Sequence, residues 1–356
     1  MIRTALVGIG NCSSSLVQAI HISSKDPDAC GLAYPLFGGY QVGDIEIVAA
    51  FDVDRRKIGK DLSHAIFAEP NCATRFGDVP FTGVTVAPGP SADGVGPTLE
   101  AFGCAGASSE ADVSSIAAEL KRCRAHVVVI FLPVGANDAA CLYAMAALEA
   151  GCALVNCTPA PLATNTHCAQ EFTDHGLPLL GDDVKSQFGS TALHRALVGL
   201  ILRRGGSIEN SYQLNVGGNA DFLNMRQPEI ASHKRHTKRA SLEEFGLDPD
   251  ALSVGPSDYV AHLGDRKVGY INIVGHGIMG ARFSVEVKLE VEDSPNAAGV
   301  VVDAVRAARV ALDRGQAGPI REPSAALFKN PPDHLSDDDA FAALGRWACS
   351  TNGVSE

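Results

Sequence analysis

The chain has 356 residues, of which 46% are hydrophobic and 20% charged, and its formal net charge is −12. This length suits about two domains, and the composition is that of an ordinary globular enzyme. The acidic balance argues against nucleic acid as the main partner, because a basic surface is the usual footprint of nucleic-acid binding. A phosphorylated metabolite remains compatible with this charge if lysines gather in one pocket.

The sequence also lacks the features of a membrane or secreted protein. It contains no run of about 18 apolar residues. The short apolar run in MIRTALVGIG ends in a glycine turn without a signal-peptide cleavage site, so it predicts a buried strand. We therefore expect a cytoplasmic protein with no membrane partner and with its ten cysteines as reduced thiols.

The first half of the chain alternates apolar strands with helices. The expected elements are strand 2–8, helix 13–20, strand 45–54, helix 54–68, a long loop 70–110 with a short strand at 83–88, helix 110–123, strand 126–133, helix 138–150 and strand 152–158. Alternation of this kind predicts βαβ units and a parallel sheet, which is an α/β fold.

The character of the chain changes after a helix expected near 186–204. Residues 207–217 and 268–291 favour long strands, and residues 283–291 alternate strictly between apolar and polar. A period of two predicts a half-buried antiparallel sheet with one polar face. The stretch 293–296 reads as a turn with good helix-capping residues, and a helix rich in Ala and Val follows at 298–313.

A glycine loop near the N-terminus has the context of a dinucleotide-binding motif. The segment Gly8-Ile9-Gly10-Asn11-Cys12-Ser13 follows a strand and opens a helix. Gly8 suits the tight turn, and Gly10 lets the backbone approach a pyrophosphate at the helix N-terminus. Ser13 replaces the third glycine, and a small residue still permits close packing of helix on strand. The segment therefore predicts a cofactor loop, with residues Gly8, Gly10, Asn11, Cys12 and Ser13 around the dinucleotide.

Asp52 strengthens this interpretation because it ends the second strand, where a carboxylate can bind the ribose hydroxyls. The same charge would repel a 2′-phosphate, so NAD is preferred over NADP. Arg55 and Arg56 follow directly and leave a 2′-phosphate as the alternative. The acid normally comes about 20 residues after the glycine loop, so residues 22–44 are an insertion.

The cysteines and histidines do not predict a metal site. No C-x-x-C pair is present, and no Cys/His cluster has zinc-finger spacing. His233 and His236 are three residues apart, but they lie in a polar segment rather than on a clear helix. We therefore expect no metal ligands.

Six further strings point to one family. They are GDDVKSQFGST at 181–191, LNVGGNADFLNM at 214–225, SHKRHTK at 232–238, GDRKVGY at 264–270, EDSPNAAGVVVDAVRAA at 292–308 and SAALFKNPP at 324–332. Together with GIGNCSSSLVQ and AAFDVD, the chain resembles the compact prokaryotic form of myo-inositol-1-phosphate synthase over nearly its whole length.

The resemblance implies a Rossmann-type NAD-binding domain, split into 1–200 and 293–356. Between its parts it implies an inserted α+β catalytic and oligomerisation domain, 201–292, with a mostly antiparallel sheet. The family is commonly tetrameric. The implied reaction is the NAD-dependent cyclisation of a hexose 6-phosphate, normally D-glucose 6-phosphate, to 1D-myo-inositol 3-phosphate. Oxidation at C5, enolisation, aldol closure and reduction at C5 leave no net redox change.

Lysines suit this chemistry, because phosphate, enolate and aldolate are all anionic and preorganised ammonium groups stabilise such charge. By position in the motifs, Lys234 matches the lysine that handles the proton on O5. Lys238 lies on the same face as Lys234 if the segment is helical. Lys267 and Lys329 match lysines that bind phosphate and stabilise oxyanions.

Polar residues complete the implied site. Asp183, Asp221 and Asp293 match acids that orient lysines and hydroxyls, although Asp293 would equally serve as a helix cap. Ser186 and Asn219 match groups that line the substrate pocket.

The chain departs from the family around its first two lysines, where the usual pattern is close to S-K-x-I-S-K. Here His233, Arg235 and His236 surround them, which leaves the sugar phosphate and the ring product open. The alternatives are a paralogue that cyclises another hexose phosphate such as fructose 6-phosphate, a plain NAD-dependent sugar-phosphate dehydrogenase, and a non-catalytic NAD sensor.

Overall fold

The computed structural model describes residues 1–25, 31–96, 100, 111–226 and 246–350. Contacts group the chain into two compact units, Met1–Lys185 with Ala297–Glu356, and Ser186–Asn296. The domain assignment at 200 and 293 stays a prediction. The contacts put the helix α7 (Ser190–Arg203) with the second unit, because its apolar side chains pack on that unit's strands.

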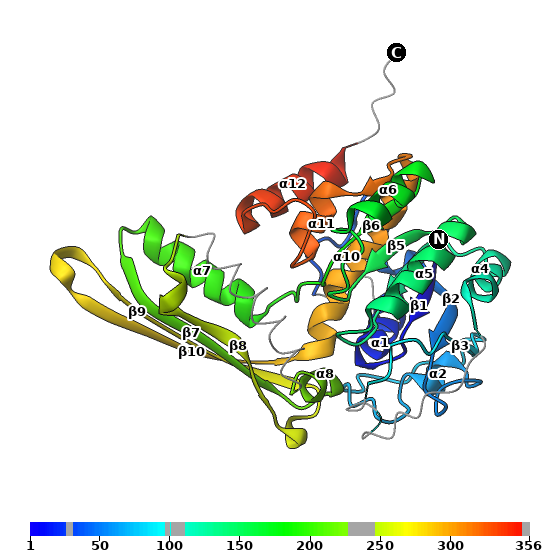
Figure 1. Cartoon of the computed structure of the whole chain (residues 1–356), viewed down its shortest axis with the longest axis horizontal. Coiled ribbons are helices and arrows are strands. Elements are labelled where there is room, and N and C mark those ends of the chain that lie inside the picture. Colours follow the sequence, from blue (N-terminus) through cyan, green and yellow to red (C-terminus); the bar gives the residue numbers. More distant parts are fainter. Residues whose placement is uncertain (26–30, 97–99, 101–110, 227–245, 351–356) are drawn as a thin grey trace, which may run out of the picture. The chain divides into compact units, whose positions relative to one another are not determined.

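The first unit is built on a seven-stranded parallel sheet in the order β11-β6-β5-β4-β1-β2-β3 (Figure 1). Its strands are β1 (Ile2–Val7), β2 (Ile45–Asp52), β3 (Val86–Pro88), β4 (Val127–Ile130), β5 (Ala153–Asn156), β6 (Pro178–Leu180) and β11 (Gly318–Pro319). The order 3-2-1-4-5-6 is that of the doubly wound Rossmann fold, whose ligands bind where the strand order reverses, between β1 and β4. This confirms the predicted α/β fold class.

Helices cover both faces of this sheet. They are α1 (Asn11–Lys25), α2 (Leu62–Ala65), α4 (Val113–Arg122), α5 (Asn137–Ala150), α6 (Thr166–Asp174), α10 (Asp293–Asp313), α11 (Arg321–Leu327) and α12 (Asp337–Cys349). Side chains of α1, α10, α11 and α12 share one buried cluster, and those of α4, α5 and α6 share the other. No helix in the described part of the chain is long and apolar enough to cross a membrane.

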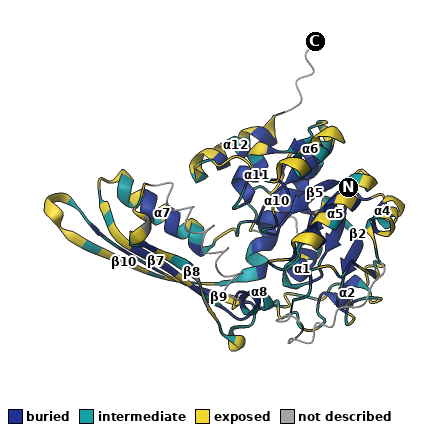
Figure 2. Ribbon diagram, viewed as in Figure 1, coloured by how far each residue is buried: buried dark blue, intermediate teal, exposed yellow. Residues whose placement is uncertain are grey.

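The alternation of side chains along the strands explains why the two clusters form. Ile2 and Leu6 of β1 belong to the first cluster, whereas Ala5 and Val7 belong to the second. Because successive side chains of a strand point to opposite faces, an uninterrupted apolar run fills both layers. Figure 2 shows these strands as buried between helices whose outer faces are exposed.

The second unit is a four-stranded sheet in the order β10-β9-β7-β8. Its elements are α7, β7 (Ser207–Gly217), α8 (Ala220–Asn224), β8 (Leu252–Tyr259), β9 (Arg266–His276) and β10 (Arg282–Glu292). The β7–β9 and β9–β10 pairs are antiparallel, and only β7 and β8 run parallel, so the predicted mostly antiparallel sheet is confirmed. Val198 of α7 packs on Ile271 and Ile273 of β9.

The helix predicted over 54–68 is wrong, because only Leu62–Ala65 are helical. Side chains compete for the backbone in this stretch. The carboxylate of Asp54 accepts a hydrogen bond from the N–H of Arg56 at 2.9 Å, and that of Asp61 accepts from Ser63 at 2.9 Å. Asp side chains that bind N–H groups two residues ahead favour turns over helix.

A buried histidine in the second unit gives a testable pH dependence. His194 is fully buried, its Nε2 lies 2.6 Å from Oγ of Ser211, and burial lowers its pKa to about 4. The folded state therefore binds fewer protons than the unfolded state between pH 4 and 6.5, so this group's contribution to stability falls as the pH falls through that window. Over this range we expect the free energy of unfolding of the wild type to fall by about 3 kcal/mol more than that of His194→Gln. Urea unfolding of both proteins at pH 7 and pH 4.5 measures it, and parallel pH profiles would contradict it.

Candidate active site

The glycine loop joins β1 to α1, and its two glycines meet different constraints. Gly8 has φ of +82°, and a Cβ there would lie 2.7 Å from the backbone oxygen of Phe131. Only glycine fits such a position without strain. In contrast, a Cβ at Gly10 would have no atom within 4 Å. The backbone at Gly10 thus borders open space beside the N-terminus of α1, where a phosphate can approach closely.

Ser13 takes the place of the third glycine of the motif. It is fully buried, and its Oγ donates a hydrogen bond of 2.6 Å to the carbonyl of Gly8. The small side chain therefore ties the first turn of α1 to the end of β1, which preserves the close packing that a glycine would allow.

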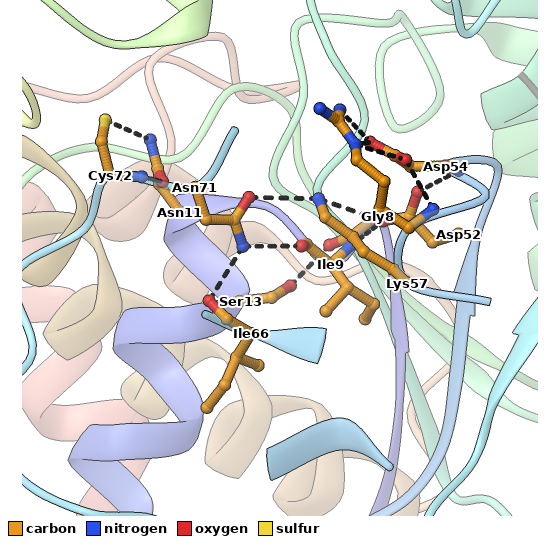
Figure 3. Close-up of polar contacts among 11 residues, drawn as sticks. Gly8, Ile9, Asn11, Ser13, Asp52, Asp54, Lys57, Ile66, Asn71 and Cys72 are labelled. Carbon is orange, nitrogen blue, oxygen red and sulfur yellow. Dashed lines mark hydrogen bonds and ion pairs between the residues drawn. The ribbon is translucent and has the colours of Figure 1, made fainter. Parts of the chain in front are cut away.

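Asp52 ends β2 beside this loop (Figure 3). Its Oδ2 accepts a hydrogen bond of 2.7 Å from the N–H of Ile9, and its Oδ1 accepts one of 2.8 Å from the N–H of Asp54. The ammonium of Lys57 lies 3.7 Å from Oδ2. Arg56 is paired with Asp54, with Nε 2.9 Å from Oδ1. The geometry fits a ribose-binding acid held rigidly against the glycine loop.

Asn71 and Gln18, which sequence reasoning missed, and the predicted Asn11 hold a further segment on this loop. Asn71 donates through Nδ2 to the carbonyl of Ile9 at 3.0 Å, and the side chain of Asn11 accepts from the N–H of Cys72 at 2.8 Å. Gln18 of α1 accepts from the N–H of Phe76 at 2.8 Å. Amide side chains at 11 and 18 thus attach residues 72–76 to α1, a pattern that the loop-like composition of this stretch does not reveal.

Lys329 and Asp183 lie in the same unit, although 146 residues separate them in sequence, and Nζ is 2.9 Å from Oδ1. Asp183 has φ of +61°. The backbone fixes the pair as well, because the N–H of Lys329 donates to the carbonyl of Asp183 at 2.7 Å. The ammonium of Lys329 is therefore held by the carboxylate of Asp183, just beyond the end of β6.

Asp182, also missed by sequence reasoning, supports this pair. Its fully buried carboxylate accepts hydrogen bonds from the side chain of Asn156 at 2.7 Å and from the backbone of Leu162, Ala163 and Thr164 at 3.0–3.1 Å. The loop after β5 is thus fastened to the residue before Asp183.

The glycine loop and the lysine pair both follow the carboxyl ends of strands in the parallel sheet, and the buried Cys157 follows the end of β5 between them. Burial raises the pKa of Cys157 well above its usual range, Cys12 and Asp183 add to the increase, and Lys329 opposes it. The carboxyl ends of β1, β5 and β6 therefore bring the loop and the Lys329–Asp183 pair to the same edge of the sheet.

The second unit holds another lysine pair. Nζ of Lys267 lies 3.1 Å from Oδ1 of Asp293 and 5.8 Å from the ring centre of Phe222. Asn219 caps α8 through Oδ1, and its Nδ2 donates to Oδ2 of Asp293 at 3.4 Å. Three residues predicted for the site are thus in contact.

Asp265 joins this cluster and was missed by sequence reasoning. Its Oδ1 accepts from Nδ2 of Asn219 at 3.2 Å, and its Oδ2 accepts from the N–H of Ser294 at 3.2 Å. Burial raises its pKa to about 6, and the nearby charge of Asp293 adds to this. The predicted turn at 293–296 is wrong, because α10 begins at Asp293 and Asp265 satisfies its first N–H groups.

The remaining predicted residues stand apart from these contacts. Asp221 lies in the first turn of α8, and Ser186 is half-buried before α7. Lys234 and Lys238, with their neighbours His233, Arg235 and His236, lie outside the described residues. The roles of all predicted site residues stay predictions.

A doubly wound sheet with a glycine loop, combined with carboxylate-held lysines, defines a Rossmann-type enzyme. A family model described as myo-inositol-1-phosphate synthase matches residues 189–294. The chain is 43% identical to the inositol-3-phosphate synthase of Corynebacterium glutamicum over 96% of this chain and 97% of the relative. It is also 43% identical to that of Mycolicibacterium smegmatis over 96% of each. The chain belongs to the myo-inositol-1-phosphate synthase family.

Solved structures agree with this membership. The crystal structure of Ari2 is 36% identical, with a TM-score of 0.82 over 97% of both chains. A myo-inositol-1-phosphate synthase-related protein from Thermotoga maritima, at 23% identity and a TM-score of 0.74, supports the fold alone.

Proposed function

We propose that the protein is an NAD-dependent cyclase that converts D-glucose 6-phosphate to 1D-myo-inositol 3-phosphate without net redox change. The observation that carries the proposal is the Lys329–Asp183 pair at the same sheet edge as the glycine loop. Curated relatives named inositol-3-phosphate synthase, which match almost the whole chain, support the product.

The residues around the loop fit NAD. Gly8 makes the turn, Gly10 borders the space for a pyrophosphate, and residues 11–13 offer the first turn of α1 to its charge. Asp52 is positioned to accept a hydrogen bond from a ribose hydroxyl. When bound, NAD supplies reversible hydride transfer at C5 of the sugar.

The lysines stabilise the anionic forms of the substrate. Asp183 orients Lys329 and Asp293 orients Lys267, and an ammonium with three N–H donors can bind both a carboxylate and a substrate oxyanion. Preorganised cations of this kind favour the enolate and the aldolate over the neutral sugar. Lys234, which we propose acts on the O5 proton, and Lys238 complete the set.

We also propose a cytoplasmic homotetramer. The face of the second sheet opposite α7 carries three large apolar side chains that are 38–43% exposed, Tyr212, Leu214 and Tyr270. Leu214 lies directly opposite Tyr270 in the β7–β9 register, so they form one patch. A second copy of the chain would cover it. Sedimentation velocity measures the state.

The decisive experiment supplies glucose 6-phosphate with catalytic NAD and follows products by phosphorus NMR. We expect an inositol phosphate and no steady-state accumulation of NADH by absorbance. A different cyclitol phosphate formed only from fructose 6-phosphate would instead support the paralogue. Stoichiometric NADH without a cyclic product would indicate a plain dehydrogenase, and binding without turnover would indicate a sensor.

Two alanine substitutions should separate folding from binding in the glycine loop. Gly8→Ala is expected to lower the free energy of unfolding by about 1–3 kcal/mol, because it combines positive φ with a backbone clash. Gly10→Ala should unfold like wild type but bind NAD at least about tenfold more weakly, because its methyl group occupies the space for the pyrophosphate. Urea unfolding and calorimetric titration measure the two effects. Unchanged NAD affinity in Gly10→Ala would contradict this placement of the cofactor.

A further inference from the structure

Lys57 is a buried cation beside the ribose-binding acid, and the sequence gives no hint of its burial. It is 5% exposed, whereas its neighbour Arg55 in the same run of cations is exposed. Its ammonium lies 3.7 Å from Oδ2 of Asp52 and 3.1 Å from Oδ1 of Asn71 (Figure 3). A charge of this kind is costly to bury unless it is paired.

The surrounding hydrogen bonds fix where this ammonium points. Both bonds donated by Nδ2 of Asn71 go to backbone carbonyls, of Ile9 at 3.0 Å and of Ile66 at 2.9 Å. The amide oxygen of Asn71 is therefore turned toward Lys57. Because Asn71 also contacts the glycine loop, the ammonium is anchored to two of the segments that frame the dinucleotide site, β2 and the loop.

The segment that follows β2 carries more positive than negative side chains. Residues 52–57 contain two carboxylates, Asp52 and Asp54, and three cations, Arg55, Arg56 and Lys57. Arg56 is paired with Asp54, which leaves Lys57 as the counter-charge of Asp52. The positive charge of Lys57 therefore partly cancels the repulsion between Asp52 and a 2′-phosphate.

We propose that Lys57 is a specificity-determining residue that sets the preference between NAD and NADP. While Asp52 is present, Lys57 limits the discrimination against a 2′-phosphate. Without Asp52, Lys57 becomes the cation of a 2′-phosphate site, since a fixed, buried ammonium favours any anion that replaces its partner. This inference rests on the proposed dinucleotide-binding function.

The test is a comparison of dissociation constants for NAD and NADP, measured by calorimetry on the full chain stripped of bound nucleotide. Asp52→Ser should shift the preference toward NADP by about 10- to 100-fold, the effect of one charge-assisted hydrogen bond. Asp52→Ser with Lys57→Met should lose that gain. Lys57→Met alone should bind NADP more weakly relative to NAD than wild type does.

Arg55→Met is the matched control, because it removes a cation two residues away that is exposed. It should change the ratio less than Lys57→Met, and an equal change would overturn the proposal. An unchanged ratio in the double variant relative to Asp52→Ser would also overturn it. Thermal melts check folding, and Asp52→Asn replaces Asp52→Ser if the latter does not fold. If wild type binds neither dinucleotide, the proposed function itself fails; if it binds NAD but Lys57 has no effect, only this inference fails.

Discussion

Replacing Lys329 with methionine is expected to lower kcat/KM for cyclisation by about 100- to 1,000-fold, which is the cost of removing one preorganised donor to a developing oxyanion. Lys329 is the cation that the first unit holds on Asp183, at 2.9 Å, at the same edge of the sheet as the glycine loop. Methionine keeps much of the side-chain volume, so the loss should come from charge. NAD affinity should change little, because Asp52 and the glycine loop are untouched.

Lys121→Met is the control for a lysine that is paired but lies elsewhere. It is exposed on α4, with Nζ 3.4 Å from Glu149, and a surface pair of this kind contributes little. Its kcat/KM should match wild type. Turnover of Lys329→Met within about threefold of wild type would exclude Lys329 from the chemistry, and a parallel loss of NAD affinity would indicate a structural role instead.

The lysine pairs illustrate how far sequence reasoning reaches. No spacing rule connects Asp183 with Lys329, and only the resemblance of their motifs put both in one site. The structure then accounts for two of the predicted acids, because the carboxylate of Asp183 holds Lys329 and that of Asp293 holds Lys267. Asp265 lies in the GDRKVGY string but escaped notice, because it serves the site through Asn219 and through the start of α10. It stands two residues before Lys267, immediately ahead of β9.

Lys57 was missed for a different reason. A run of three cations reads as a solvated surface, and the helix wrongly expected over 54–68 would have left that surface open. The turn at Asp54, in which the N–H of Lys57 donates to the carbonyl of Asp54 at 2.9 Å, instead brings Lys57 back to Asp52. Whether a charged side chain is buried depends on the chain folding back onto a partner in this way, and local propensity does not encode such tertiary contacts.

The strands were predictable where apolar runs are uninterrupted, as in β1, β4 and β5, and the strict alternation of β10 predicted its exposed and half-buried faces. β8 was not predicted, because Gly255 and Pro256 interrupt it. Its place at the edge of the sheet explains why a proline is tolerated, since an edge strand need not donate every N–H group.

The insertion at 22–44 also acquires a physical explanation, and it centres on Arg306 of α10. This side chain is fully buried and pairs with Asp303. Its guanidinium donates to the carbonyl of Tyr34 at 2.7 Å and to those of Pro35 and Tyr40 at 3.2 Å. One arginine thus satisfies three backbone carbonyls of the inserted segment and docks that segment on α10.

Arg306→Met is therefore expected to reduce the free energy of unfolding by about 3–5 kcal/mol at pH 8, because it leaves a buried carboxylate without its counter-charge. Burial already raises the pKa of Asp303 to about 6. A folded-state pKa above the unfolded value means that protonation favours the folded state, so the penalty should shrink as the pH falls through 6. Urea midpoints of wild type and variant at pH 8 and pH 5.5, at one protein concentration, measure both effects.

Arg309→Met provides the matched control on the same helix. Arg309 is partly exposed, pairs with Asp313 at 2.6 Å four residues on, and donates through Nε to the hydroxyl of Tyr40 at 3.3 Å without reaching a described backbone carbonyl of the inserted segment. Helical pairs as exposed as this contribute less than about 1 kcal/mol. Its unfolding should differ little from wild type at either pH. If Arg306→Met is no more destabilising than Arg309→Met, or if its penalty does not depend on pH, the buried pair does not hold the inserted segment. If Arg306→Met loses much of its free energy of unfolding at pH 8 and less at pH 5.5, α10 anchors residues 34–40 mainly through Arg306, whose charge Asp303 balances.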